Sequence, residues 1–216
     1  MKLSYILAAL AVFSGQAWAE PSSKVAWTLD TLHLVEKGDA AKGKQLAQTC
    51  DSCHAATPQN ASSPNPSLQG QLATYLYKQL RDYKDGSRPN PVMAGMAAGL
   101  SDQDMADVAA YYSRETGPSW RKESFVSDIV EQLVERGDGK RILPPCQACH
   151  ESNGKGQKID IPALAGQKAA YLEQTLLAYK SGERHNDLYS RMRSITQQLG
   201  DEEIKQLARY YAGSDH

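Results

Sequence analysis

The chain has 216 residues, of which 41% are hydrophobic, and its 24 basic and 25 acidic residues give a formal net charge of −1. This length suits one large domain or two small ones, and the balanced charge argues against a nucleic-acid-binding protein, which would carry a clear basic excess. Two Phe and three Trp make a core poor in bulky side chains, and four Cys are too few for a disulfide-stapled scaffold.

The first 19 residues have the pattern of an export signal. Lys2 supplies a positive start, an apolar stretch runs from Leu3 to Phe13, and Ala17-Trp18-Ala19 offers a small-residue cleavage site. The apolar stretch is shorter than the roughly 20 residues that span a bilayer. We therefore expect a signal peptide at residues 1–19, cleaved after Ala19, rather than an uncleaved anchor, and a mature protein in the periplasm.

The remainder of the chain contains one pattern twice. Cys50-Asp51-Ser52-Cys53-His54 matches Cys146-Gln147-Ala148-Cys149-His150, 96 residues later, and Pro66-Ser67-Leu68-Gln69-Gly70 matches Pro162-Ala163-Leu164-Ala165-Gly166 at the same offset. After a three-residue insertion, Met93 matches Met192 at an offset of 99. Two copies predict two homologous domains in tandem. We place them at residues 20–117 and 125–216, joined by a linker at 118–124.

Each copy is predicted to be helical. Apolar and aromatic residues share one helical face from Leu72 to Tyr83, and the same face recurs from Tyr171 to Tyr179. Ser101 has the position of a helix cap, and the helix that it opens is matched by Ile204–Tyr211 in the second copy. No stretch alternates long enough for a strand, so the predicted fold class is all-α, with three or four short helices per copy. Such small units would need a large buried prosthetic group to complete their cores.

The two Cys-x-x-Cys-His motifs identify that group. This motif attaches c-type haem: its two thiols can add to the vinyl groups of one porphyrin, and the adjacent imidazole can then bind the iron. A four-cysteine zinc site or short disulfides would leave His54 and His150 unexplained, and a thioredoxin-like dithiol would need a βαβ context. We therefore predict two haem c groups, held covalently by Cys50 and Cys53 and by Cys146 and Cys149.

The second iron ligand is inferred from the repeat. Met is the usual partner of His in electron-carrying cytochromes c. The second copy contains only Met192, which aligns with Met93, so these two are the expected ligands. Met96 aligns with Ile195 and is expected to be an apolar wall residue. The other candidates are Met105, expected in a helix core, His33 and His216, expected at the surface, and His185, a rival ligand near Met192.

The paired motifs resemble the dihaem cytochrome c4 family, whose members are tandem class I cytochrome c domains, over nearly all of the mature chain. The resemblance implies one haem per domain with His/Met axial ligands, and haems that meet near the domain interface through their propionate edges. It also implies that the carbonyls of Pro66 and Pro162 accept hydrogen bonds from the ligating imidazoles, which fixes each ring and its tautomer.

Two features depart from the family pattern. The stretch Lys24–Leu34 is longer than expected before the first domain, and its counterpart Phe125–Leu133 suggests an added helix in each half. Arg191 and Arg193 beside Met192 have no equivalents beside Met93. This asymmetry could give the two haems different potentials or partners.

The expected function follows from the coordination. Two filled axial positions leave neither iron open to substrate, so we expect an electron carrier and not an enzyme. Its redox partners would be a periplasmic dehydrogenase or quinol-oxidising complex and a terminal oxidase or other acceptor, with no nucleic acid and with peripheral membrane association as a further option. Two alternatives are a dedicated electron-accepting subunit of a periplasmic dehydrogenase, such as a thiosulfate dehydrogenase, and a dihaem redox enzyme such as a peroxidase.

Overall fold

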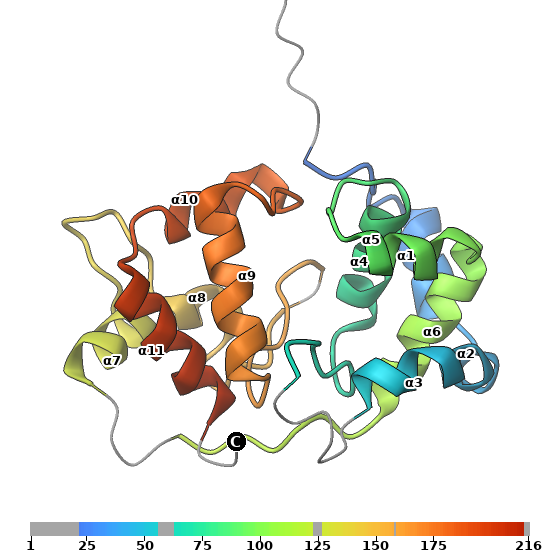
Figure 1. Ribbon diagram of the computed structural model, residues 1–216, viewed down its shortest axis with the longest axis horizontal. Helices are drawn as coiled ribbons and strands as arrows, with labels where there is room; N and C mark the ends of the chain where they lie inside the picture. The colour runs from blue at the N-terminus through green and yellow to red at the C-terminus, as the bar shows by residue number, and fades with distance from the viewer. Residues whose placement is uncertain (1–21, 56–62, 123–126, 158, 214–216) are drawn as a thin grey trace, which may run out of the picture.

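The computed structural model describes residues 22–55, 63–122, 127–157 and 159–213. The predicted signal peptide, its cleavage site after Ala19, and His216 lie outside these residues. The described chain folds into two helical halves that lie side by side (Figure 1), and apart from two isolated β-bridges these residues form no strand. The all-α prediction is confirmed. In the same residues, no helix is long and apolar enough to cross a membrane.

Within the described residues, each half has more helices than the three or four predicted, because short helices also form around the cysteine motifs. The first half contains α1 (Leu29–Glu36), α2 (Ala40–Leu46), α3 (Gln48–His54), α4 (Ala73–Lys84), α5 (Pro91–Ala98) and α6 (Asp102–Arg114). The second contains α7 (Asp128–Glu135), α8 (Cys146–His150), α9 (Ala169–Ser181), the 3₁₀ turn η2 (Leu188–Ser190), α10 (Arg191–Thr196) and α11 (Asp201–Ala212).

The halves differ where their sequences differ in length. The second copy is three residues shorter between its Gly-Asp pair and its first cysteine, and no counterpart of α2 forms among the described residues there. The second copy is three residues longer before its methionine, and η2 occupies this loop. Tyr189 and Ser190 in that turn have positive φ angles of 58° and 54°. The insertion is therefore accommodated locally and leaves the repeated helices in place.

Side chains cap three of the helices that the sequence predicts. Ser101 accepts a hydrogen bond from the Asp104 backbone nitrogen, and the Asp104 carboxylate accepts from the Ser101 nitrogen, which completes the capping box of α6. The added helices expected in each half are confirmed as α1 and α7, a few residues later than the predicted stretches. Thr28 caps α1 and Ser127 caps α7.

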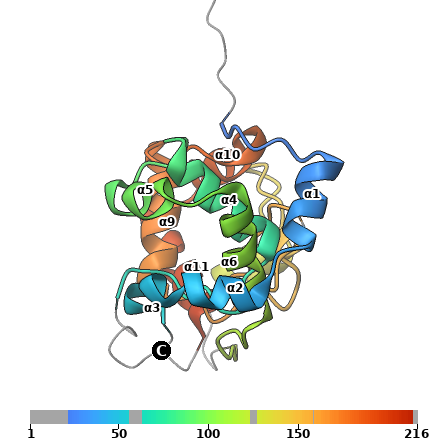
Figure 2. The same ribbon diagram turned by 90° about the vertical axis from the view of Figure 1, so that its right-hand side faces the viewer.

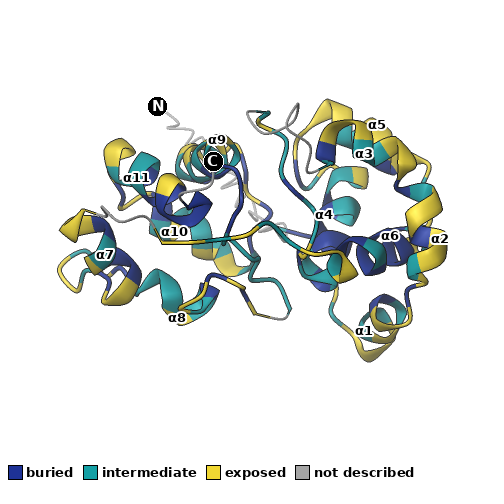
Figure 3. Ribbon diagram, turned by 90° about the horizontal axis from the view of Figure 1, so that it is seen from below, coloured by how far each residue is buried: buried dark blue, intermediate teal, exposed yellow. Residues whose placement is uncertain are grey.

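Each half has its own hydrophobic core. In the first half, α6 supplies Met105, Val108 and Tyr112, all at most 4% exposed, and the core is largely aliphatic and small. In the second half, α7 and α11 supply most of the core, including Val130 and Ile204. Figure 3 shows the corresponding burial of α6 in the first half and the exposed outer surfaces of α2 and α5. Two separate cores agree with two tandem domains.

Residues 117–119, between the two halves, pass against the repeated Pro-x-Leu-x-Gly segments. Gly70 and Gly166 have φ angles of 72° and 71°, which residues with a side chain rarely adopt. A Cβ atom at Gly70 would lie 2.7 Å from the Gly117 Cα, and one at Gly166 would lie 2.7 Å from the Ser119 carbonyl oxygen. The glycines therefore let residues 117–119 approach both halves closely.

Candidate functional site

A cavity of about 820 Å³ runs through both halves, near the upper end of the roughly 300–1,000 Å³ range usual for ligand pockets. In the first half, α2 and α3 lie along one edge and α5 along the opposite edge, with α4 between them (Figure 2). The motif cysteines and histidine therefore enter the first half of the cavity from a different side than Met93. The cysteines and histidines of both motifs line it: Cys50, Cys53, His54, Cys146, Cys149 and His150.

Both histidines are fixed by a proline carbonyl. His54 Nδ1 lies 2.8 Å from the Pro66 carbonyl oxygen, and His150 Nδ1 lies 3.0 Å from that of Pro162. A carbonyl oxygen can only accept, so Nδ1 carries the proton and Nε2 keeps its lone pair. Burial lowers the pKa of both imidazoles, which favours the neutral form. Each ring thus presents one nitrogen suited to a metal ion.

None of the four cysteines, all of which the structure describes, forms a disulfide. Cys53 is exposed and the other three are half-buried. Among the described residues, which include all four cysteines, no three His, Cys, Asp or Glu side chains gather in a cluster that could hold a metal ion. The two motifs therefore do not combine into a zinc site.

Met93 and Met192 both line the cavity. Met93 lies in the first turn of α5, where the Asn90 side chain accepts a hydrogen bond from its backbone nitrogen at 2.9 Å. Met192 lies in the first turn of α10, and its carbonyl accepts a hydrogen bond from the Thr196 hydroxyl at 2.9 Å. Both methionines are thus presented by the start of a helix.

The other candidate ligands occupy different positions. Met96 also lines the cavity and is 40% exposed, whereas Met105 is fully buried in the core, as predicted. His33 is exposed, as predicted. His185 is exposed as well, lies outside the residues that line the cavity, and contacts the Glu183 carbonyl at 3.2 Å. Of the two arginines beside Met192, Arg193 pairs with Asp187 at 2.7 Å, and Arg191 lines the cavity.

Helices α4 and α9 form equivalent walls of the cavity. Tyr75, Leu80 and Tyr83 line it from α4, and Tyr171, Leu176 and Tyr179 line it from α9. These residues belong to the repeated apolar face of the sequence. The wall is therefore apolar and aromatic on both sides, as a planar macrocycle requires.

The two halves are joined by a pair of glutamines that the sequence reasoning missed. Gln71 donates from Nε2 to the Ala163 carbonyl at 3.0 Å and accepts from the Ala163 nitrogen at 2.9 Å. Gln167 does the same with Ser67, at 2.9 Å in both directions. Both pairs are related by the same 96-residue offset. The interface is therefore pseudo-symmetric.

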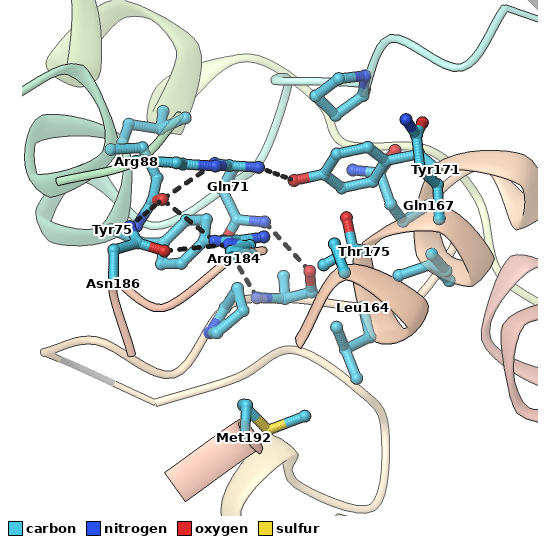
Figure 4. Close-up of a pocket in the computed structure, with 18 of the residues that line it drawn as sticks. Gln71, Tyr75, Arg88, Leu164, Gln167, Tyr171, Thr175, Arg184, Asn186 and Met192 are labelled. Atoms are coloured by element: carbon cyan, nitrogen blue, oxygen red, sulfur yellow. Dashed lines mark hydrogen bonds between the residues drawn. The ribbon is translucent and has the colours of Figure 1, made fainter. Parts of the chain in front are cut away.

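A second pseudo-symmetric pair was also missed. Arg88 lies over the Tyr83 ring of its own half, 4.6 Å from the ring centroid, and its Nη2 donates to the Tyr171 hydroxyl of the other half at 3.2 Å. Its Nη1 donates to Gln79 Oε1 at 2.8 Å. Figure 4 shows the Arg88 side chain extending toward Tyr171.

Arg184, 96 residues later, repeats this arrangement in reverse. It lies over the Tyr179 ring at 4.5 Å, and its Nη2 donates to the Tyr75 hydroxyl of the first half at 3.0 Å. Its Nε donates to Asn186 Oδ1 at 3.0 Å. Each guanidinium is therefore held between an aromatic ring of its own half and a phenol of the other half (Figure 4). The repeat spacing was the signal that could have found this pair.

One buried polar cluster breaks the symmetry. Lys78 Nζ lies 2.6 Å from Asp82 Oδ2 and donates to the Asn186 carbonyl at 2.6 Å, and the Asp82 carboxylate also accepts from Asn186 and from Ser23. Asp160 lies 3.9 Å from Lys78, and burial raises its pKa to about 6. From sequence, Lys78 and Asp82 resemble a solvent-exposed pair one helical turn apart. The second half buries them.

The residues present fit haem c. Each half offers two thiols, an imidazole with a free Nε2, a methionine and an apolar wall around one cavity. In c-type cytochromes, two cysteines attach the porphyrin through thioether bonds. An imidazole nitrogen and a methionine sulfur bind its iron.

Comparisons with known proteins agree with this site. The cytochrome c family model matches residues 40–113 and 137–212. The chain is 36% identical to cytochrome c4 of Pseudomonas aeruginosa, over 82% of this chain and 89% of that protein. It is also 36% identical to the thiosulfate dehydrogenase electron acceptor of Stutzerimonas stutzeri, over 84% and 90%.

A solved structure gives the same result. The crystal structure of reduced recombinant cytochrome c4 from Pseudomonas stutzeri superposes with a TM-score of 0.75 and 34% identity, over 82% of this chain and 98% of that chain. Each half of the present chain thus corresponds to one cytochrome c domain with one haem. The chain belongs to the cytochrome c family as a dihaem cytochrome c4, an electron carrier with two covalently bound haem c groups.

Proposed function

We propose that His54 and Met93 are the axial ligands of the first haem iron, and His150 and Met192 those of the second. Cys50 and Cys53 would hold the first haem covalently, and Cys146 and Cys149 the second, within domains at residues 20–117 and 125–216. The observation that supports this best is the repeated hydrogen bond from each imidazole to the carbonyl of Pro66 or Pro162 inside the cavity. That bond keeps Nε2 unprotonated and fixes the ring, which makes it a rigid iron ligand.

We further propose that the protein is not itself an enzyme. When bound, haem iron supplies one-electron redox chemistry. The chain's own residues hold the imidazoles and methionines on helices, keep the ring tautomer fixed, and surround the cavity with apolar walls. Fixed ligands of this kind limit rearrangement when an electron arrives or leaves. With both axial positions taken, the residues of the chain leave no place for substrate at either iron.

We also propose a periplasmic location, which rests on the export pattern of residues 1–19. The partners would be periplasmic redox proteins, such as a dehydrogenase or quinol-oxidising complex as donor and a terminal oxidase as acceptor. A dedicated role as electron acceptor of a thiosulfate dehydrogenase is a second candidate, because a relative at 36% identity carries that description. The mature chain is weakly acidic, since removal of Lys2 leaves 23 basic and 25 acidic residues. This favours partners with a basic docking surface.

To test the carrier function, the reduced holoprotein is mixed separately with carbon monoxide, with peroxide and with an oxidised cytochrome. We expect the added cytochrome to oxidise the reduced holoprotein rapidly, and we expect neither carbon monoxide nor peroxide to bind at either haem. Tight carbon monoxide binding or fast peroxide turnover at one native haem would overturn the carrier assignment and favour the redox-enzyme alternative. Stopped-flow reduction of the oxidised holoprotein, by thiosulfate dehydrogenase with thiosulfate and by other donors, then separates a dedicated subunit from a general shuttle.

A further inference from the structure

Residues 22–28 form a non-helical segment before α1, here called the N-terminal strap, that contacts both halves. The Ser22 hydroxyl donates to the Asp187 carbonyl of the second half at 2.8 Å. The Ser23 hydroxyl donates to Asp82 Oδ1 in α4 of the first half at 2.6 Å. Two successive residues of the strap thus bind opposite halves. The strap includes the start of the N-terminal stretch that is longer than the family pattern.

The rest of the strap is fixed to the first half. Ser23 is 7% exposed, and its hydroxyl also accepts a hydrogen bond from the Val25 nitrogen at 3.2 Å. The side chains of Val25 and Trp27 pack against the core of the first half, and the Trp27 and Tyr77 ring centroids are 6.2 Å apart. The strap is therefore part of the first half, and Ser22 extends it onto the second.

The Ser23 hydroxyl completes a buried charged cluster that the two halves share. Asp82 Oδ2 lies 2.6 Å from Lys78 Nζ and accepts from Asn186 Nδ2 at 2.6 Å, whereas Asp82 Oδ1 accepts from Ser23. The Lys78, Asp82 and Asn186 residues are at most 1% exposed. A buried carboxylate is costly unless its oxygens are hydrogen-bonded. Docking of the strap and docking of the second half therefore favour each other, because each supplies a partner to the same carboxylate.

The strap lies at the edge of the interface opposite the chain connection. In Figure 1 residues 117–122 pass below the two halves, whereas the strap begins above them, between the halves, and runs over the first half to α1. The covalent connection thus joins the halves along one edge, and the strap joins them along the other.

We propose that the N-terminal strap holds the two halves in one fixed arrangement, with Ser22 bound to the second half and Ser23 bound to the first. Release of the strap removes a partner from the Asp82 carboxylate and a contact from the second half, so the halves then separate more often. In a dihaem carrier, a fixed arrangement of the halves keeps the two haem sites at one separation. This role is independent of which residues bind the irons.

The test measures amide hydrogen exchange in the reduced mature holoprotein by nuclear magnetic resonance. The Ser67 nitrogen donates to Gln167 and the Ala163 nitrogen donates to Gln71, so both hydrogen bonds cross the interface. Exchange at these two amides therefore reports separation of the halves.

We expect Ser23→Ala to speed exchange at both interface amides by about tenfold, because it removes a hydrogen bond to a buried carboxylate. Ser22→Ala removes a hydrogen bond to a neutral carbonyl, so we expect a rise of about threefold. The amides of Val108 and Leu207, which are buried in the two separate cores, should keep their wild-type rates.

Ser181→Ala is the matched control. The Ser181 hydroxyl accepts from the nitrogen of Glu183, two residues later, at 3.4 Å, as the Ser23 hydroxyl does from Val25. It donates, however, to the Ala178 carbonyl within the second half at 3.1 Å. Exchange at the two interface amides should therefore equal that of the wild type.

Wild-type exchange at the interface amides in either Ser22→Ala or Ser23→Ala would overturn the proposal. An equal rise at Val108 and Leu207 would overturn it too, because it would indicate a general loss of stability. If Ser23→Ala does not fold with two haems, Ser22→Ala carries the test, since it leaves the Asp82 contact intact. Carbon monoxide binding by the wild type would instead contradict the proposed carrier function, so the two failures are distinguishable.

Discussion

Gln71 and Gln167 occupy equivalent positions in the two halves, and each uses its side-chain amide to pair with both backbone groups of one residue in the opposite half. Both glutamines are buried. Gln71→Ala should remove three hydrogen bonds, two with Ala163 and one from the Leu72 nitrogen, and leave the Ala163 backbone groups unpaired, at a cost of about 1–3 kcal/mol in the free energy of unfolding. Gln167→Ala should behave alike. Urea unfolding followed at the haem bands measures this cost.

Gln197→Ala provides the control for these variants. Gln197 is exposed and lies outside the cavity lining, so its removal should change stability by less than about 0.5 kcal/mol. We also expect the interface variants to unfold in two separate transitions, because each half has its own core. A single transition at the wild-type midpoint would show that the glutamine pairs do not hold the halves together.

The sequence predicted more of the fold within each half than between the halves. The repeated face from Leu72 to Tyr83 and the cap at Ser101 follow from local periodicity and capping. The helices after Lys24 and Phe125 follow from the extra length of two matching stretches, and all of these elements appear in the structure. Short helices such as α3 were missed, because a helix of seven residues has too few turns to show a period.

The contacts across the interface could not be predicted from one copy of the repeat. Lys78 and Asp82 have the spacing of an exposed ion pair, and only the docking of the second half buries them. Arg88 and Arg184 occupy equivalent positions in the two copies of the repeat, but equivalent positions in a sequence need not lie close together in the structure. Their approach depends on how the two halves dock against each other, which long-range packing sets.

Removal of one cysteine pair should remove one haem. We expect the denatured wild type to carry the mass of the mature chain plus two haem groups, because thioether bonds survive unfolding. The double variant Cys50→Ala, Cys53→Ala should keep only the haem of the second half. The double variant Cys146→Ala, Cys149→Ala should keep only the haem of the first half. Intact mass spectrometry measures this, and a wild-type mass with fewer than two haems would refute the covalent assignment.

Met93→Leu and Met192→Leu should each remove the methionine–iron charge-transfer band of one haem and lower the potential of that haem, since methionine ligation raises it. Met96→Leu is the matched control: Met96 lies in the same helix and lines the same cavity, but aligns with Ile195 in the second copy. Its spectrum should equal that of the wild type. Loss of the band in Met96→Leu but not in Met93→Leu would show that the repeat alignment is wrong at the ligand.

Asp160 should make stability depend on pH. Burial raises its pKa to about 6, with Asp82 adding to this effect and Lys78, Arg184 and Arg191 opposing it. An unfolded Asp has a pKa of about 3.9, so the folded state disfavours the ionised form. The contribution to stability is fully present below about pH 4 and is lost as the pH rises through about 6.

Asp160→Asn should therefore match the wild type near pH 4 and exceed its stability at pH 7 by roughly 1–3 kcal/mol. Urea unfolding at several pH values measures the difference. Asp201→Asn is the control, because Asp201 is exposed and contacts only Lys180 among the described residues. A stability difference that does not change between pH 4 and pH 7 would contradict the proposed cause.

Tyr112 and Tyr211 offer the sharpest comparison between the halves, because they are equivalent residues in different polar surroundings. The Tyr112 hydroxyl donates to Asp51 Oδ1 at 2.7 Å, whereas the Tyr211 hydroxyl is buried and has no hydrogen-bond partner among the described residues. The difference arises because Gln147 stands where the first half has Asp51. Tyr112→Phe should cost about 1.5–3 kcal/mol, the range for a hydrogen bond to a charged group. Tyr211→Phe should be neutral or stabilising, because it removes a buried hydroxyl that lacks a partner. Unfolding of the two holoproteins under identical conditions checks both values, and equal losses in the two variants would contradict the assigned contacts.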